Sequence, residues 1–230
     1  MTGSQRSAGV TLSAQHVLCR TGWFSEQPED FQNRIKALAH WRRFRAGENL
    51  YEVGDRADAV FGLEDGLVDV AIPISSDEMV NIWRAKPGFW VGDSALFSDN
   101  PRGVSLTANV DSLVLVIPGG ALRRHFSETP HDIVFFYKLS HVNVMLALSV
   151  LSEVIALPPR ARFSRMLLRM ASDDGVVRVT QAELGSMAGM SRAAFRRAFS
   201  ELIGSGVLRT EYGAVRIVDR EALSREANAR

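Results

Sequence analysis

Residues 178–204, RVTQAELGSMAGMSRAAFRRAFSELIG, decide the fold of the C-terminal part of the chain. Thr180 is followed three residues later by Glu183, which is the spacing of a capping box at the start of a helix. This first helix is short and breaks at Gly189, and Ser191 then serves as the N-cap of a second helix. The stretch is therefore predicted to be a helix-turn-helix.

The second helix of this pair has an apolar face and a basic face. Its apolar residues follow the i, i+3, i+4, i+7 spacing of a buried stripe: Phe195, Ala198, Phe199, Leu202 and Ile203. Its arginines lie off that stripe, mostly toward the N-terminal end, where a helix in the major groove meets base edges. A solvated arginine face would be the commoner explanation for helices at large, but the turn and the following segment favour DNA. The predicted contacts are Thr180, Gln181, Ser191, Arg192, Ala193, Arg196 and Arg197.

Residues 207–218, VLRTEYGAVRIV, are predicted to form a β-hairpin wing beside that helix. Two β-rich runs flank Tyr212-Gly213, a pair typical of a tight turn. Arg209 and Arg216 stand on the two arms. A wing next to a recognition helix lies along the phosphate backbone, so these two arginines are predicted to position the protein rather than read sequence.

The charge distribution agrees with a DNA-binding C-terminal module. The segment from Leu157 onward holds 13 Arg, no Lys and 8 acidic residues, whereas the preceding 156 residues hold 14 basic and 18 acidic ones. Arginine without lysine suits bidentate contacts to guanine and phosphate. A basic third on a slightly acidic body is the pattern of a DNA-binding module joined to another domain.

Composition bounds the class of protein. The chain has 230 residues, of which 46% are hydrophobic, enough for two small domains. Its single cysteine, Cys19, excludes a disulfide framework and a cysteine-ligated iron–sulfur cluster within one chain. No signal peptide is evident, and the longest apolar run, 142–157, contains polar residues typical of a buried helix rather than a membrane span. We expect a soluble, cytoplasmic protein that does not enter a membrane.

The middle of the chain is predicted to be all β. A helix is expected over PEDFQNRIKALAHW (28–41). From Phe44 to Ile117 the chain then consists of short β-rich runs, cut by Gly and Pro about every 8–15 residues, as in an antiparallel barrel or jelly roll. The fold class is therefore α+β: an N-terminal antiparallel barrel, a long helix and a C-terminal winged helix-turn-helix.

A long helix is predicted over about 131–156, with two apolar stripes. The first stripe is Ile133, Tyr137, Ser140, Val144, Ala147, Leu151 and Val154, and the second is Phe135, Leu139, Val142, Leu146 and Val150. One stripe can pack on the barrel while the other pairs with a second copy in a parallel coiled coil. A fully buried core helix of a monomer would have the same spacing. Pro158-Pro159 ends the helix and marks a hinge, which gives predicted domains of 1–130, 131–157 and 158–230.

With this order of elements, the chain resembles the Crp/Fnr family of bacterial transcription regulators from about residue 40 to 220. The segments that carry the resemblance are RFRAGENLYEVGDRADAVFGLEDGLVDV (43–70), PGFWVGDSALFSDNPRGVSLTA (87–108) and TQAELGSMAGMSRAAFRRAF (180–199). The resemblance implies a cyclic-nucleotide-binding-like barrel and a homodimer that binds a palindromic operator in double-stranded DNA. It also implies RNA polymerase as a partner if the protein is an activator, and either an unidentified effector or constitutive activity.

Residues 87–108 resemble the family's phosphate-binding cassette. Gly92 and Arg102 match the glycine and the phosphate-clamping arginine of members that bind cyclic nucleotides. Asp93 replaces a glutamate that reaches the ribose, and Gly103 replaces a phosphate-binding serine. On the long helix, Ala147-Leu148, or Leu148-Ser149 in a shifted register, stands where cAMP-responsive members have a Thr-Ser pair that meets the adenine.

These replacements disfavour cAMP. Three weakened contacts at about 1 kcal/mol or more apiece would lower affinity by at least about two decades. A cAMP-dependent regulator stays the alternative hypothesis, with Gly92, Asp93, Arg102, Gly103, Ala147 and Leu148 as the candidate effector site. Equally open is a cassette kept only as a barrel loop, in which Arg102 forms a structural ion pair.

Other ligands and functions find less support in the sequence. The spacing H-x-x-C of His16 and Cys19 is the only pair that suggests a haem ligand, and such a pair is far more often structural. The remaining histidines share no metal-ligand spacing, so no metal is predicted. The chain has no P-loop, H-E-x-x-H or G-x-S-x-G motif, which argues against an enzyme. A ligand-binding protein-interaction module without DNA readout is the alternative from another class.

The recognition helix departs from the cAMP-responsive branch of the family. Arg192 and Arg197 match two arginines that read the half-site there, but Ala193 stands where a glutamate would accept from a cytosine amino group. Arg196 adds a charge where that branch has glycine. We therefore predict a half-site that differs from the TGTGA type and favours guanines.

Overall fold

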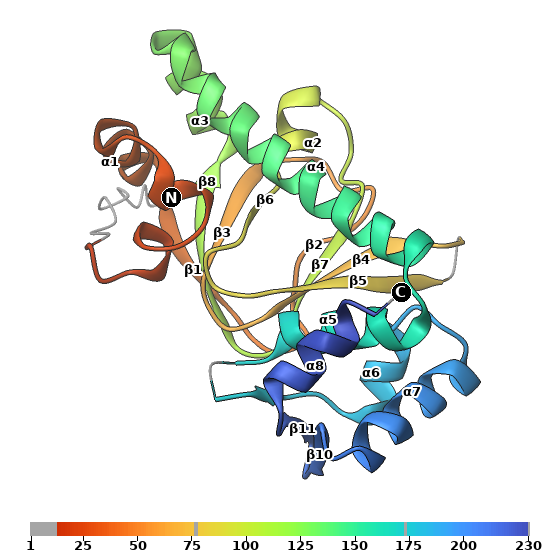
Figure 1. Cartoon of the computed structure of the whole chain (residues 1–230). Coiled ribbons are helices and arrows are strands. Elements are labelled where there is room, and N and C mark those ends of the chain that lie inside the picture. The colour runs from red at the N-terminus through yellow and green to blue at the C-terminus, as the bar shows by residue number, and fades with distance from the viewer. Residues whose placement is uncertain (1–12, 76–77, 173, 230) are drawn as a thin grey trace. The chain divides into compact units, whose positions relative to one another are not determined.

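The computed structural model describes residues 13–75, 78–172 and 174–229. The chain forms two compact units, Met1–Met145 and Leu146–Arg230, which divide inside one long helix (Figure 1). The domain boundaries predicted on either side of that helix stay predictions.

The first unit contains antiparallel β-sheet throughout its described strands. The strands are β1 (His40–Phe44), β2 (Asn49–Tyr51), β3 (Ala59–Asp65), β4 (Val68–Pro73), β5 (Met79–Ala85), β6 (Trp90–Val91), β7 (Ser105–Ala108) and β8 (Ser112–Pro118). One sheet has the order β1-β8-β3-β6 and the other the order β2-β7-β4-β5. Their inward side chains, among them Phe44, Phe61 and Leu106, form a buried core. The antiparallel β architecture expected from the sequence is confirmed.

Short helices precede and follow these strands. They are η1 (Val17–Cys19), η2 (Trp23–Glu26), α1 (Glu29–Leu38), α2 (Asp93–Ser98), α3 (Gly119–Glu128) and η3 (Pro130–Asp132), followed by the long α4 (Ile133–Ala156). Helix α1 begins after Pro28 as predicted, but it ends at Leu38, because residues 40–44 pair with β8 as strand β1. The sequence pattern had extended this helix to Trp41.

An aromatic cluster holds the N-terminal segment and α4 against the barrel. Trp23, Phe24 and Phe31 meet Trp90 of the barrel and Phe136 of α4, with ring centroids 5.1–6.4 Å apart. All five side chains are buried. Because each buried aromatic contributes about 2–3 kcal/mol of hydrophobic free energy, this cluster fixes the N-terminal half of α4 on the barrel.

Helix α4 is buried along only one side within the single chain. Phe136 and Leu139 are fully buried, whereas much of the opposite surface is exposed. The sequence predicts a buried helix over 142–157, but most of these side chains are exposed in the single chain. Of the two predicted stripes, the first is exposed except for Ser140, whose hydroxyl bonds to Asp93, and the second is buried or half-buried except for Val142. By length and composition, Pro130–Ala156 is apolar enough to cross a membrane.

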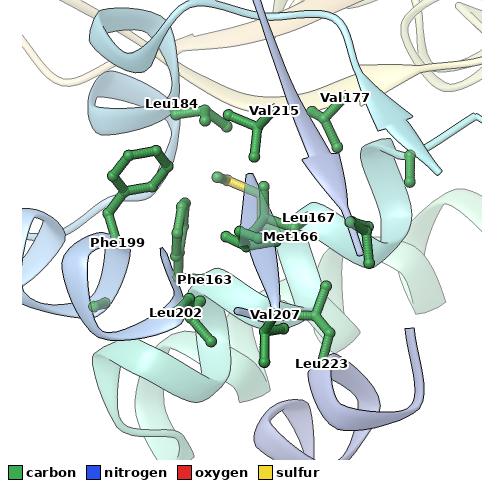
Figure 2. Close-up of a cluster of buried hydrophobic side chains, with 14 of the residues drawn as sticks. Phe163, Met166, Leu167, Val177, Leu184, Phe199, Leu202, Val207, Val215 and Leu223 are labelled. Carbon is green, nitrogen blue, oxygen red and sulfur yellow. The ribbon is translucent and has the colours of Figure 1, made fainter. Parts of the chain in front are cut away.

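The second unit is a small three-stranded winged helix. Its elements are α5 (Pro159–Met170), β9 (Val176–Val177), α6 (Gln181–Met187), α7 (Arg192–Gly204), β10 (Leu208–Glu211), β11 (Ala214–Ile217) and α8 (Arg220–Ala227). The sheet order is β10-β11-β9. Figure 2 shows the core, in which Phe163, Leu167, Leu202 and Leu223 of the helices are drawn with Val177 of β9 and Val215 of β11.

Proline and a buried ion pair organise the junction between α4 and α5. Helix α4 ends at Ala156, Pro158 is the N-cap of α5 and Pro159 its first residue, so the break falls where the sequence predicted it. The buried carboxylate of Glu153 accepts from Arg169 Nη1 at 2.6 and 2.8 Å. This ion pair joins the last turns of α4 to α5.

A second buried carboxylate, Asp132, anchors the start of α4. Arg34 of α1 donates to both of its oxygens, at 2.8 and 2.9 Å, and His125 Nε2 lies 2.7 Å from Oδ2. His131 Nε2 lies 3.1 Å from Oδ1. Burial alone would raise the pKa of Asp132, but the hydrogen bonds from Arg34 and His125 outweigh it and hold the pKa below its ordinary value.

Asp132→Asn is expected to lower the free energy of unfolding by about 2 kcal/mol at pH 7, a value reduced because Arg34 is partly exposed. Because the folded-state pKa is lowered, the carboxylate stabilises the fold above about pH 4 and this contribution is lost on acidification. Urea unfolding at several pH values should therefore show the difference from wild type shrinking as pH falls. Asp30→Asn removes the exposed partner of the same Arg34 and should have a much smaller effect; equal effects would contradict the assignment.

Candidate functional site

Two capped helices present the basic surface of the second unit. Thr180 Oγ1 accepts from the Glu183 backbone N–H at 3.2 Å, and the Glu183 carboxylate accepts from the Thr180 N–H at 2.8 Å, so the predicted capping box is confirmed. Ser191 Oγ accepts from the Ala194 N–H and caps α7. Gly189 takes a φ of 57° in the turn, a conformation that favours glycine.

The core of the second unit fixes which face of α7 is exposed. Phe195 and Phe199 stack on each other with centroids 5.6 Å apart, and both contact the ring of Phe163 of α5. Ala198 and Leu202 complete the buried stripe, as predicted from their spacing. Burial of this stripe turns the remaining faces of α7 to solvent.

Three arginines occupy the exposed face of α7. Arg192, Arg196 and Arg197 are all exposed, and Ala193 is exposed beside them. Within residues 13–75, 78–172 and 174–229, no carboxylate lies within 4.0 Å of any of the three guanidinium groups. Their positive charge is thus uncompensated inside the chain, and it is free to meet an anion. Gln181, at the start of α6, is exposed as well.

The wing carries two arginines, one of which bonds to a carboxylate on the neighbouring strand. Arg209 and Arg216 stand opposite each other on β10 and β11. The Arg216 guanidinium bonds to the carboxylate of Glu211 on the neighbouring strand and donates to the Asp174 carbonyl at 3.3 Å. Arg209 is exposed, and Tyr212 at the tip of the hairpin is fully exposed. The structure thus leaves Arg209 freer than Arg216 for an external partner, a distinction that the sequence did not indicate.

In the first unit, Arg102 of the cassette points into the protein. Its side chain is 1% exposed and donates to two backbone carbonyls, that of Gly92 at 2.9 Å and that of Ala59 at 2.7 Å. Nη2 lies 3.4 Å from an oxygen of Asp58, and the guanidinium carbon sits 4.2 Å from the ring centre of Tyr51. This arginine therefore joins the loops of the barrel, and its charge is balanced by carbonyl dipoles, an exposed carboxylate and an aromatic face.

Gly92 is required by that arrangement. It has a φ of 102°, and a Cβ atom built on it would lie 2.7 Å from Arg102 Nη1. Any larger residue would therefore strain the backbone and displace the guanidinium. Gly103, by contrast, is exposed with open space around it, so nothing in the fold demands glycine there.

Asp93 points inward as well, toward the long helix. Its side chain is buried and accepts from the hydroxyl of Ser140, and its Oδ1 lies 3.5 Å from the amide nitrogen of Asn143. Asn143 also donates to the Trp90 carbonyl at 3.1 Å. Burial raises the pKa of Asp93 above its ordinary value, against hydrogen bonds from Ser140 and the backbone that act in the other direction.

The sequence indicates Arg102 and Asp93 as site residues, but it does not indicate the side chains that they contact. Tyr51 belongs to a β-rich run with no distinguishing mark, and Ser140 was placed in an apolar stripe. The one usable signal is that Ser140 and Asn143 are polar and lie three positions apart on a largely apolar helix, which puts both on one face. The other two residues proposed for the effector, Ala147 and Leu148, are exposed on α4.

Apolar side chains of the barrel line a small cavity. A cavity of about 10 Å³, room for about one water molecule, is lined by Leu50, Phe61, Leu63, Val68, Phe89, Val91, Leu106 and Val114. No group of three His, Cys, Asp or Glu side chains within the described ranges is arranged to hold a metal ion. His16, one of the two residues considered for haem, stacks on Trp41 with centroids 5.4 Å apart.

Arg102→Ala is expected to lower the free energy of unfolding by about 3 kcal/mol, because it leaves the buried carbonyls of Ala59 and Gly92 without their donor. Arg123→Ala is the matched control, since Arg123 is half exposed while donating to the Leu96 carbonyl and to Asp99, and it should cost less than about 1 kcal/mol. Urea denaturation measures both. An Arg102→Ala protein as stable as the control would mean that Arg102 is not a structural residue.

Each of the two units matches a known protein family. Residues 41–129 match the family model "Cyclic nucleotide-binding domain" and residues 161–226 match "Crp-like helix-turn-helix domain". The "Transcriptional regulatory protein btr" of Bordetella pertussis is 25% identical over 90% of this chain and 88% of its own length. The "CRP-like cAMP-activated global transcriptional regulator" of Mycobacterium tuberculosis is 23% identical over 80% of this chain and 86% of its own.

Solved structures share the fold at low sequence identity. FixK2 of Bradyrhizobium japonicum aligns with a TM-score of 0.70 and 17% identity, over 84% of this chain and 98% of its own. The c-di-GMP-responsive global regulator CLP of Xanthomonas campestris aligns with a TM-score of 0.67 and 22% identity, over 84% of this chain and all of its own. CLP and the cAMP-activated regulator of Mycobacterium tuberculosis thus differ in the effector to which they respond.

Proposed function

Since this chain belongs to the Crp/Fnr family of transcription regulators, we propose that it binds a palindromic operator as a homodimer and does so without cAMP. The observation that supports DNA binding is the row of exposed arginines on α7, which have no carboxylate partner among the described residues. In a helix that lies in the major groove, such arginines donate in pairs to guanine O6 and N7. Arg192, Arg196 and Arg197 are the proposed readers, and Arg209 a proposed phosphate contact.

The proposed dimer forms along the exposed side of α4. Seven exposed residues follow an unbroken 3-4 spacing: Val134, Tyr137, His141, Val144, Leu148, Leu151 and Ile155. We call this row the seam. Six of the seven are apolar or aromatic, and the spacing is the a/d repeat by which two helices form a coiled coil. A pair of recognition helices is what a two-fold palindromic site requires.

A second copy of this chain suits α4 better than lipid does. The side of α4 turned away from the seam carries Asn143 and Glu153, and Ser140 lies at its edge; each of these three side chains bonds to a polar group of the chain. A helix that bonds to its own chain on one side and has a heptad seam on the other is the expected form of a dimerisation helix. Because DNA is accessible in the cytoplasm, we propose that the protein is located there. The proposed role is regulation of transcription without enzymatic activity.

The cassette supports a regulator whose DNA binding does not depend on cAMP. A phosphate ligand would compete for the Arg102 guanidinium with two backbone carbonyls, and a ribose ligand would compete for Asp93 with Ser140. Gly103 offers no hydroxyl. Each bond that a ligand must break subtracts from its affinity by about 1 kcal/mol or more. Constitutive activity, or an effector that binds elsewhere, fits these residues better than a cyclic nucleotide.

Selection of bound duplexes from a random pool is expected to enrich a guanine-containing palindrome with the wild-type protein and none with Arg197→Ala. A bidentate arginine–guanine pair contributes about 1–3 kcal/mol, and a dimer would lose two of them. Arg225→Ala, which removes an exposed arginine of α8, should retain the palindrome. If Arg197→Ala footprints the same site with the wild-type salt dependence, α7 does not read the operator.

The same selection with added cAMP tests the effector. We expect the same palindrome at the same enrichment with and without the nucleotide. A palindrome recovered only with cAMP would restore the cAMP-dependent alternative and show that Asp93 and Gly103 are tolerated. No enrichment under either condition, with binding that also lacks salt dependence, would favour a protein-interaction module.

Cysteine cross-linking in a Cys19→Ser background should locate the dimer interface. Val144→Cys lies on the seam and is expected to form an intermolecular disulfide rapidly under mild oxidation. Val142→Cys is the matched control, because the two valines are 55% and 47% exposed but lie on different sides of the same helix. Gel electrophoresis measures the yield. Equal yields, or a faster reaction at position 142, would rule out the seam as the interface.

A further inference from the structure

On the basis of the proposed dimer, we propose that the hydrogen bond between Asp93 and Ser140 sets the rotation of α4 on the barrel and thereby determines which side of α4 is offered to the second subunit. Asp93 belongs to α2 in the cassette and Ser140 to α4. We call Asp93, Ser140 and Asn143 the latch. Their role here is to position a helix, not to bind a ligand.

The latch is the directional contact between α4 and the cassette. The other directional contacts, the Arg34–Asp132 ion pair and the bond from Trp23 Nε1 to the Phe135 carbonyl at 2.8 Å, lie at the start of the helix. Between them and the latch, Phe136 and Leu139 pack into the aromatic cluster. Apolar packing is favourable in many similar arrangements, whereas a buried carboxylate with no hydrogen-bond donor is costly. Asp93 is 1% exposed and takes donors from α4 through Ser140 and Asn143. A rotated helix would take these two side-chain donors away and leave the buried carboxylate with hydrogen bonds from the backbone alone.

Such a constraint is needed because both sides of α4 are apolar. Val142, Val144 and Met145 are exposed hydrophobic residues, so hydrophobicity alone does not distinguish the side that faces the barrel from the side that faces a partner. Ser140 lies at the edge of the inward side. At about 100° per residue, it is only about 40° around the helix from Val144 of the seam. A bond at this edge fixes where the inward side ends and the seam begins.

The bond also connects the cassette to the dimer interface. Asp93 follows Gly92, whose carbonyl accepts from Arg102. A change in the cassette that moves α2 would therefore move the acceptor of Ser140 as well. The latch would in this way give the barrel control over the seam, and so over the spacing of the recognition helices, in the absence of any ligand.

The cross-linking assay measures the rotation of α4 directly. In the Cys19→Ser background, Ser140→Ala is combined separately with Val144→Cys and with Val142→Cys, and the ratio of the two disulfide yields is compared with that of the parent. We expect Ser140→Ala to lower this ratio several-fold, while Ser140→Thr, which keeps the hydroxyl, preserves it. Ser152→Ala is the control on the same helix, because its hydroxyl bonds only to the Ser149 carbonyl.

Asp93→Asn supplies a second test from the other side of the bond. Asparagine has one acceptor oxygen where aspartate has two, so either Ser140 or Asn143 would lose its acceptor. Asp93→Asn should therefore lower the ratio of disulfide yields, as Ser140→Ala does. Circular dichroism and thermal unfolding identify which variants are folded, and Ser140→Ala removes a single oxygen atom. An unchanged ratio in folded Ser140→Ala protein would overturn the latch and leave the dimer in place. A parent without cross-linking at position 144 would overturn the dimer and the latch together.

Discussion

A single chain buries only one side of α4 and leaves apolar residues of the opposite side exposed to solvent. The N-terminal half of the helix rests on the aromatic cluster through Phe136 and Leu139, and its opposite side presents a heptad row of exposed apolar residues. Hydrophobic surface of this extent on a helix needs a partner. In the proposed dimer, a second copy would cover this surface and bring two recognition helices together, as a two-fold palindromic site requires.

The charged side chains of the cassette have their partners inside the first unit. The glycine and the arginine that resemble a phosphate site are both present, but Arg102 joins two loops through backbone carbonyls, and Gly92 has the conformation that leaves room for it. Asp93, one methylene shorter than the glutamate of cyclic-nucleotide-binding relatives, bonds to α4. Buried charges need partners, and here both charges find them inside the protein.

In the DNA-binding unit, packing of the core determines which face of α7 is exposed. Its aromatic core takes one face of α7, and the cap at Ser191 starts the helix at the point where its arginines begin. The arginines of α5 behave differently, since Arg160 pairs with Glu201 and Glu226, and Arg169 with Glu153. Arginines of α5 thus hold helices of this unit together, whereas those on the exposed face of α7 have no such carboxylate partner among the described residues.

The sequence by itself determined the elements and their order: the capping box at Thr180, the buried stripe of α7, the hairpin around Gly213, the break at Pro158 and the alternating strands. These features depend on neighbours within about one or two helical turns or one hairpin, so spacing reveals them. Only the tertiary structure decided which distant partner each buried charged side chain has. The pairs Arg102–Ala59, Asp93–Ser140 and Arg34–Asp132 join residues more than 40 positions apart. Their geometry depends on how the sheets and helices pack, which no local pattern encodes.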